Sequence, residues 1–501
     1  MKKILFVIVI SLISFSAIAQ SQRSRNNETF LNPVFAGDYP DPSILRDGDD
    51  FYLVHSSFEY YPGLLVWHST DLINWLPLSN ALHKYVGSVW APDLVKYDGR
   101  YYIYFPASNK NYVVTADNIE GPWSEPVLLD IELIDPGHVV DEIGNRYLYF
   151  NNGSYVPLSK DGLSITGDIQ HSYDGWIIPR DWTIECFCME GPKLFRRGDY
   201  YYLTVAQGGT AGPPTGHMVI SARSKSPLGP WENSPYNPIL RTQSVDEQWW
   251  SVGHATIFDD SNDEWYMIFH GFENGFYHMG RQTMLTPLEW TKDGWYKIPD
   301  ATEIDKPIAI PQLDNKHTEE FNLSDPFNAT ELKSQWKFYK ESGDTRYTCS
   351  SDGFVMNGKG NDVSNCSPLL TIPSDHSYTV DVKLEIEGNA IGGLVLFYNE
   401  RAYSGILADK NSILANLRGW QFVSEKNAIS QHVHLRLNNT NNIVDMYYSL
   451  DGKEWFKIEN SFDCSAYHHN VLSGFMSLRI GLCSIGQGKV KFKNYEYHPH
   501  K

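Results

Sequence analysis

Asp41-Pro42-Ser43-Ile44-Leu45, followed shortly by Phe51-Tyr52-Leu53-Val54, is the first of five similar segments in this chain of 501 residues. Most copies open on a polar residue and close on a run of residues that favour strands. The later copies are Ala91-Pro92-Asp93-Leu94-Val95 with Tyr101–Tyr104, Asp135-Pro136-Gly137-His138-Val139 with Tyr147–Phe150, Glu190-Gly191-Pro192-Lys193-Leu194 with Tyr200–Leu203, and His254-Ala255-Thr256-Ile257-Phe258 with Trp265–Ile268. Segments that recur in this way indicate a repeat architecture.

Polar, turn-rich tracts separate the two halves of each copy, for example Asp98-Gly99-Arg100 and Arg197-Gly198-Asp199. Between apolar strands, such tracts predict hairpin turns. Repeats of roughly 45 to 65 residues that consist of short strands are typical of β-propeller blades. The sequence therefore predicts an all-β fold that contains a five-bladed β-propeller.

The residues that open the copies matter most for function, because equivalent positions of a propeller meet around its central channel. Superposing the copies brings Asp41, Asp135, Glu190 and His254 to nearly the same place. A competing explanation is that Asp-Pro and Glu-Gly-Pro only initiate turns. Their recurrence in register favours convergence, because a turn former needs no fixed phase relative to the other repeats.

Three carboxyl groups in one pocket suit the hydrolysis of a glycosidic bond. One carboxylic acid protonates the leaving oxygen, and one carboxylate activates water or attacks the sugar carbon. A third carboxylate can raise the pKa of the acid by like-charge repulsion and hold it protonated near neutral pH.

Six ordered motifs across roughly residues 30 to 300 resemble glycoside hydrolase family 43, and its β-xylosidase and α-L-arabinofuranosidase members above all. The motifs are Asn32-Pro33-Val34 through Asp41-Pro42-Ser43, Ser57-Phe58-Glu59-Tyr60-Tyr61-Pro62-Gly63, Trp90-Ala91-Pro92-Asp93-Leu94, Ile134-Asp135, Met189-Glu190-Gly191-Pro192 and Gly280-Arg281-Gln282-Thr283. The resemblance implies an inverting exo-glycosidase on a five-bladed propeller. It assigns Asp41 as the general base, Glu190 as the general acid and Asp135 as the residue that tunes the pKa of the acid.

The resemblance also implies that Phe58 and Trp90 line the sugar subsite and that Arg281 hydrogen-bonds a sugar hydroxyl. These roles agree with the physical chemistry, because aromatic faces stack on the C–H face of a sugar and a guanidinium fork fixes hydroxyl geometry. For Phe58, a place in the hydrophobic core is an equal alternative.

His254 corresponds to a histidine that relatives place near a bound cation, commonly calcium and sometimes through water. Because calcium prefers oxygen ligands, a His254 that is hydrogen-bonded in the channel without any metal is an equal alternative. The implied chemistry requires no cofactor. Gln207 and Gln282 stand where many relatives carry glutamate, so the details of the subsite and the substrate stay open.

Alternating strands replace the repeats in the last part of the chain, for example at Tyr378–Leu384 and His432–Leu437. Period-two alternation with glycine and asparagine turns predicts an antiparallel β-sandwich of jelly-roll type. The pattern resembles the concanavalin-like domain of many family 43 xylosidases. We expect a propeller domain at residues 30–308 and a sandwich domain at residues 319–501, which closes one side of the pocket, binds polysaccharide or only stabilises the propeller.

The N-terminus carries Lys2 and Lys3, then an apolar run and the small-residue sequence Ala17-Ile18-Ala19. This order predicts a signal peptide at residues 1–19. The apolar run is too short for a comfortable membrane span. We therefore expect a soluble protein that is exported to the periplasm or outside the cell.

Export permits disulfides. Cys349, Cys366, Cys464 and Cys483 could form two bridges, whose pairing the sequence does not determine. Cys186 and Cys188 are so close in the chain that a bridge between them would be strained, and we expect them to be free, buried thiols.

The formal net charge of −19 argues against a nucleic acid partner and against a polyanionic substrate. Neutral xylo-oligosaccharides, arabino-oligosaccharides or arabinoxylan are the expected substrates. Two other functions remain open: a non-catalytic propeller that binds sugars through the same carboxyls, and an endo-acting arabinanase, which would differ in the length of its products.

Overall fold

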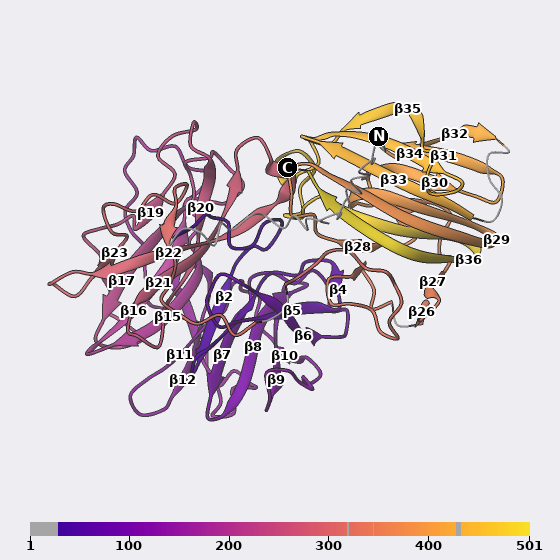
Figure 1. Ribbon diagram of the computed structural model, residues 1–501. Helices are drawn as coiled ribbons and strands as arrows, with labels where there is room; N and C mark the ends of the chain where they lie inside the picture. Colours follow the sequence, from indigo (N-terminus) through magenta and orange to yellow (C-terminus); the bar gives the residue numbers. More distant parts are fainter. Residues whose placement is uncertain (1–28, 318–319, 344, 427–431, 501) are drawn as a thin grey trace, which may run out of the picture.

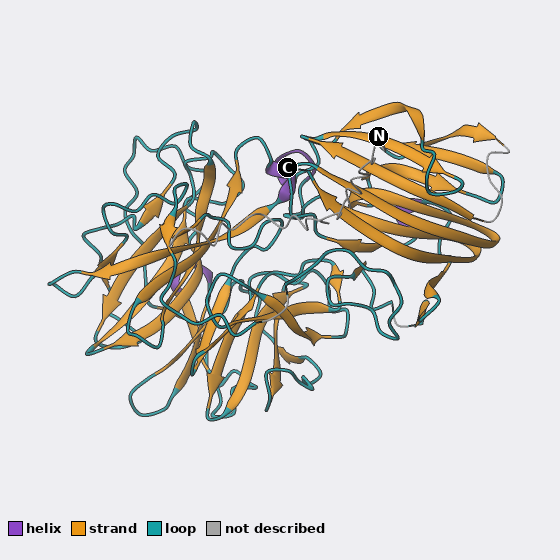
Figure 2. Ribbon diagram, in the orientation of Figure 1, coloured by secondary structure: helices purple, strands orange, loops and turns teal. Residues whose placement is uncertain are grey.

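The computed structural model describes residues 29–317, 320–343, 345–426 and 432–500, whose regular secondary structure is almost all β-strand and forms two domains (Figures 1 and 2). The predicted signal peptide, residues 1–19, lies outside the described residues. Within the described ranges, none of the helices has the length and apolar character that crossing a bilayer requires.

The first domain is the predicted five-bladed propeller, and each blade is an antiparallel sheet whose strands follow one another in sequence. Blade 1 contains β2 (Ser43–Asp47), β3 (Asp50–Val54), β5 (Gly63–Ser69) and β6 (Leu76–Leu82). Blade 2 contains β7 (Asp93–Tyr97), β8 (Arg100–Ala107), β9 (Lys110–Ala116) and β10 (Val127–Leu129). Blade 3 contains β11 (Gly137–Val140), β12 (Arg146–Tyr149), β13 (Ser154–Pro157) and β14 (Gln170–His171).

Blades 4 and 5 complete the ring. Blade 4 contains β15 (Glu190–Arg197), β16 (Tyr200–Gln207), β17 (Met218–Ser224), β18 (Glu232–Asn233) and β19 (Leu240–Arg241). Blade 5 contains β20 (Trp249–Asp259), β21 (Trp265–Glu273), β22 (Arg281–Trp290) and β23 (Tyr296–Lys297). The short strands β1 (Thr29–Phe30) and β24 (Ile308–Ala309) pair with each other and hold the two ends of the propeller segment together.

The polar tracts form the predicted hairpin turns. In blade 2, Tyr97 pairs with Arg100, and the two residues between them, Asp98 and Gly99, have φ values of 48° and 78°. Two successive positive φ values define the type I′ turn, which matches the twist of the flanking strands.

A buried ion pair links blade 2 to blade 4, and blade 3 is bonded to the same carboxylate. Lys193 Nζ lies 2.6 Å from Asp93 Oδ1 and donates to the Pro92 carbonyl at 2.9 Å. The other Asp93 oxygen accepts the backbone N–H of His138 at 2.7 Å. Removing one partner of such a buried pair costs about 3–5 kcal/mol, because the other charge is left unpaired. These contacts fix the first strands of blades 2, 3 and 4 relative to one another.

The second domain is the predicted β-sandwich, and two long strands organise it (Figure 1). β29 (Tyr378–Asn399) pairs with β36 (Arg479–Pro499) along most of its length. The first part of β29 also pairs with β33, and the last part pairs with β30, so the two long strands contribute to both layers. Gly388, at φ 73°, lies midway along β29, between these two parts.

The remaining sandwich elements are short. They are β25 (Lys337–Tyr339), β26 (Tyr347–Ser350), β27 (Gly353–Asn357), β28 (Leu369–Thr371), β30 (Ala402–Ala408), β31 (Ser412–Leu417), β32 (Trp420–Lys426), β33 (His432–Thr440), β34 (Ile443–Ser449), β35 (Phe456–Asp463) and the helix α1 (His469–Leu472). The expectation of two bridges among Cys349, Cys366, Cys464 and Cys483 is wrong, because all four are free. Three of them are fully buried in the apolar core, where a thiol packs as a small hydrophobic side chain.

The two domains share a sheet and a core. The short strand β4 (Tyr60–Tyr61), which lies between β3 and β5, pairs with β25 of the sandwich. The side chains of Phe58 and Tyr60 belong to the hydrophobic cluster of the sandwich. The face of blade 1 that carries the motif from Ser57 to Gly63 is therefore built partly by the second domain.

Candidate active site

The residues that open the repeats meet at the channel, as predicted. Asp41, Asp135 and His254 share a left-handed backbone conformation, with φ values of 57°, 59° and 51°. In the fourth copy, the positive φ of 60° falls on Gly191, directly after Glu190. Such conformations cost about 1–3 kcal/mol for residues other than glycine, and they cluster at functional sites.

Asp41 is buried and surrounded by hydrogen-bond donors. Its Oδ1 lies 2.9 Å from Arg281 Nη1 and 3.4 Å from His254 Nδ1. Its Oδ2 accepts a hydrogen bond from Ser56 Oγ at 2.5 Å, and its backbone N–H donates to His270 Nδ1 at 3.0 Å. Burial alone would raise the pKa of Asp41, but the charge of Arg281 and the surrounding donors outweigh it and hold this pKa well below its usual value.

The two histidines beside Asp41 are held neutral. Burial lowers the pKa of His254 to about 3 and that of His270 to about 4. The ring of His254 lies against Gly191, where a Cβ atom would approach the ring within 2.9 Å. A side chain at position 191 would therefore displace His254 and the start of β15.

Asp135 and Glu190 are the other two carboxyl groups of the site, and both interact electrostatically with Asp41. Asp135 Oδ2 accepts the backbone N–H of Gly191 at 3.0 Å. Burial and the charge of Asp41 raise the pKa of Asp135 to about 7. Burial, then the charges of Asp135 and Asp41, raise the pKa of Glu190 well above its usual value. Because the Gly191 N–H favours the ionised form of Asp135, the pair retains its proton on Glu190.

The two aromatic residues assigned to the sugar subsite differ in exposure. Trp90 is 37% exposed, whereas Phe58 is 1% exposed. The Arg281 guanidinium carbon lies 5.9 Å from the centre of the Phe58 ring. Phe58 is therefore a core residue beside Arg281, whereas the side chain of Trp90 is partly exposed.

The sandwich contributes a side chain that the sequence did not predict. Phe475, in the loop after α1, lies with its ring 6.1 Å from Trp90 and 5.5 Å from the guanidinium of Arg281. Its ring stacks on His469 at 3.8 Å, and the nearby Leu478 N–H donates to the His278 carbonyl at 3.0 Å. This loop forms a wall of the site from the second domain.

The two glutamines that depart from the family pattern have specific partners. Gln207 Nε2 donates to the Trp176 carbonyl at 3.2 Å, and its Oε1 accepts the Trp176 N–H at 2.8 Å. Gln282 Nε2 donates to Glu273 at 2.9 Å, and its Oε1 accepts the Gly37 N–H at 3.2 Å. Each amide both donates and accepts, which an ionised glutamate cannot do.

The expectation that Cys186 and Cys188 are free, buried thiols is wrong. They form a disulfide, and both are partly exposed. The Glu185 N–H donates to the Gly208 carbonyl, the Gly208 N–H donates to the Phe187 carbonyl, and Cys188 adopts a φ of 36°. This bend brings the two Cα atoms to 5.2 Å, within the range that a disulfide requires. The bridge closes a small loop just before Glu190.

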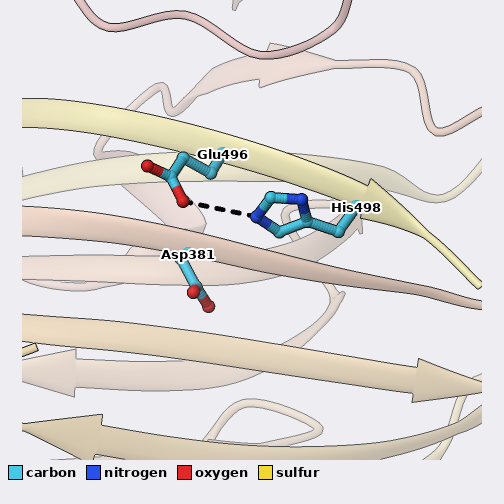
Figure 3. Close-up of side chains that lie close together, drawn as sticks. All are labelled: Asp381, Glu496 and His498. Atoms are coloured by element: carbon cyan, nitrogen blue, oxygen red, sulfur yellow. Dashed lines mark hydrogen bonds and ion pairs between the residues drawn. The ribbon is translucent and has the colours of Figure 1, made fainter. Parts of the chain in front are cut away.

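Among the described residues, one group of three side chains has the spacing of a metal site: Asp381, Glu496 and His498 on the sandwich (Figure 3). Asp381 already accepts two hydrogen bonds from Arg436, both at 2.6 Å, and Glu496 and His498 are exposed. The group is therefore a surface ion network. In the channel, His254 Nε2 is buried without a partner in the described ranges, and a single imidazole nitrogen does not suit direct calcium coordination.

Sequence reasoning missed Ser56 and His270, the other partners of Asp41. His270 carried a weak signal, because it interrupts the apolar run of β21. Ser56 directly precedes a quoted motif, but only the fold shows its bond to Asp41.

Comparisons with known proteins agree with this geometry. The family model described as "Glycosyl hydrolases family 43" matches residues 30–296, and the model described as "Beta xylosidase C-terminal Concanavalin A-like domain" matches residues 324–498. A non-reducing end α-L-arabinofuranosidase of Bacteroides ovatus is 32% identical over 77% of each chain. A xylan 1,3-β-xylosidase of a Vibrio species is 30% identical over 86% of this chain and 90% of the relative.

Solved structures show the same two-domain arrangement. The xylan β-1,4-xylosidase of Bacillus halodurans superposes with a TM-score of 0.83 at 25% identity, over 93% of this chain and 99% of that one. Because the family model matches more than half of the sequence, the chain belongs to glycosyl hydrolase family 43.

Proposed function

We propose that the protein is an inverting exo-glycosidase that removes terminal pentoses, β-1,4-linked xylose or α-L-arabinofuranose, from plant cell-wall oligosaccharides or arabinoxylan. The observation that carries this proposal is the opposite shift of two carboxyl pKa values in one channel, down at Asp41 and up at Glu190. The names of the curated relatives support the choice of pentoses.

In the proposed mechanism, ionised Asp41 takes a proton from a water molecule as that water attacks the anomeric carbon. Protonated Glu190 gives its proton to the leaving oxygen in the same step, and the configuration at the anomeric carbon inverts. Asp135 acts on Glu190 through its like charge. Arg281 holds Asp41 ionised, and its remaining N–H groups can bind a sugar hydroxyl.

Exo action follows from the wall that the sandwich provides. The ring of Phe475 lies 5.5 Å from the Arg281 guanidinium and 6.1 Å from the ring of Trp90. A chain that extended in both directions would have to pass this ring. We infer that the site accepts the end of a chain, and that the predicted signal peptide brings the enzyme to such chains outside the cytoplasm.

To test this function, the mature protein is incubated with xylo-oligosaccharides, arabino-oligosaccharides and arabinoxylan. Chromatography identifies the products, and proton NMR follows the anomeric configuration of the first product. Release of single pentoses with inverted configuration is expected. Longer products would indicate an endo-acting arabinanase, and binding without release would indicate a sugar-binding protein. Glu190→Gln serves as the inactive control.

A further inference from the structure

A cavity of about 60 Å3 lies between blade 1 and the sandwich. The propeller contributes Asp38, Ser57 and Tyr60 to its lining, and the sandwich contributes Lys337 and Arg479. A buried water molecule needs about 10–15 Å3 by the same kind of measure, so the cavity has room for several waters or a small ion.

The lining contains more polar atoms than the described residues satisfy. Those that are buried without a hydrogen-bond partner in the described ranges are Asp38 Oδ2, His55 Nδ1, Ser57 Oγ, Tyr60 Oη, Thr371 Oγ1 and Arg479 Nε. Buried polar groups are normally paired, because leaving one unpaired is costly. Six such atoms around one cavity indicate a polar occupant.

The charges of the lining favour an anion over water alone. Arg479 Nη2 lies 3.5 Å from Asp38 Oδ2, so this pair is balanced. Lys337 is 8% exposed, and the partner of its Nζ is the amide oxygen of Asn80, which carries no charge. Burial and the charge of Arg479 lower the pKa of Lys337 to about 7. A buried ammonium that lacks a counter-charge is costly, and a bound anion would remove that cost.

We propose that this cavity binds a small monovalent inorganic anion, of the size of chloride, between Lys337 and Arg479 with the hydroxyls of Ser57, Tyr60 and Thr371. The anion supplies the counter-charge that the Lys337 ammonium lacks, and it accepts hydrogen bonds from the unpaired donors. Its site joins the two domains and lies behind the base, because Ser56 lines the same cavity and donates to Asp41. Anion binding is therefore expected to stabilise the contact between propeller and sandwich.

Thermal unfolding of the full chain at pH 7 tests this proposal, with sodium chloride compared with sodium gluconate at equal ionic strength. Gluconate is too large for the cavity, so it controls for screening. A ligand that binds only the folded state raises Tm as its concentration exceeds Kd, and we expect a rise of about 2–4 °C over a hundredfold increase in chloride. The same Tm in both salts would overturn the proposal.

Two variants locate the effect. Lys337→Met should lose the difference between the salts, whereas Lys340→Met, which removes an exposed lysine that pairs with Glu400, should keep it. A chloride effect that persists in Lys337→Met would contradict the assignment. A crystal of the wild-type protein grown with bromide gives a readout that does not depend on the variants folding: an anomalous peak in the cavity supports the site, and water density alone overturns it.

Discussion

Asp41 and Glu190 are carboxyl groups in one channel, yet their surroundings shift their pKa values in opposite directions. Burial disfavours the ionised form of both carboxyl groups. On one side, the Arg281 guanidinium and the Ser56 hydroxyl, together with the neighbouring histidine rings, compensate for that burial, and the carboxylate is kept. On the other side, the strongest effects of neighbouring charges come from the carboxylates of Asp135 and Asp41, so the proton is kept. The comparison shows that neighbouring side chains, rather than the identity of the acid, decide which group is the base and which is the acid.

Replacing either carboxyl group by its neutral amide is expected to have the largest effect on activity. Glu190→Gln and Asp41→Asn should each reduce kcat by about 10²–10⁴-fold, since each removes a proton transfer from the reaction. Steady-state kinetics and calorimetric binding of an oligosaccharide measure the two effects separately, and affinity should persist. Glu232→Gln is the matched control, because Glu232 lies in the same blade and its exposed carboxylate pairs with Arg223. Full turnover in Glu190→Gln would remove it as the acid.

Arg281→Met should make the electrostatic surroundings of Asp41 resemble those of Glu190. Without the guanidinium, burial dominates and the pKa of Asp41 rises. Because the base must be deprotonated, the acidic limb of the kcat/KM profile should move to higher pH, by about one unit or more. The position of the limb is the readout, since the variant also loses a sugar contact. An acidic limb that does not move would contradict the role of Arg281.

Asp135→Asn tests the acid side. Removing the like charge lowers the pKa of Glu190, although burial still keeps it above its usual value. Because the acid must be protonated, the alkaline limb of the profile should move to lower pH, by up to about one unit. The acidic limb, which Asp41 sets, should change little. An alkaline limb that moves upward would show that Asp135 does not act through its charge.

The sequence predicted members of this site in two ways: the repeats indicated the carboxyl groups and His254, and the family motifs indicated Trp90 and Arg281. Asp41, Asp135, Glu190 and His254 occupy one phase of a recurring segment, so their convergence follows from the fold class alone. Phe475 belongs to no repeat and reaches the site only through the packing of a second domain. The Cys186–Cys188 bridge was excluded on chain spacing, because the bend at Cys188 that makes it feasible arises from pairing with Gly208. Phe58 carried two interpretations, and its burial favours the core.

Phe475→Ala should have the smallest effect, because it removes the wall that the sandwich provides and leaves the pKa values of Asp41 and Glu190 unchanged. Aromatic contacts contribute about 0.5–1.5 kcal/mol, so KM for short oligosaccharides should rise roughly two- to tenfold, with little change in kcat or in either limb of the pH profile. Phe422→Ala, at an exposed position of the sandwich, should leave KM unchanged. A large fall in kcat would mean that Phe475 orients Arg281, which its ring contacts, and would tie the sandwich to the base rather than to the shape of the pocket. Products longer than one sugar from the variant would show that this ring is what restricts the wild-type enzyme to chain ends.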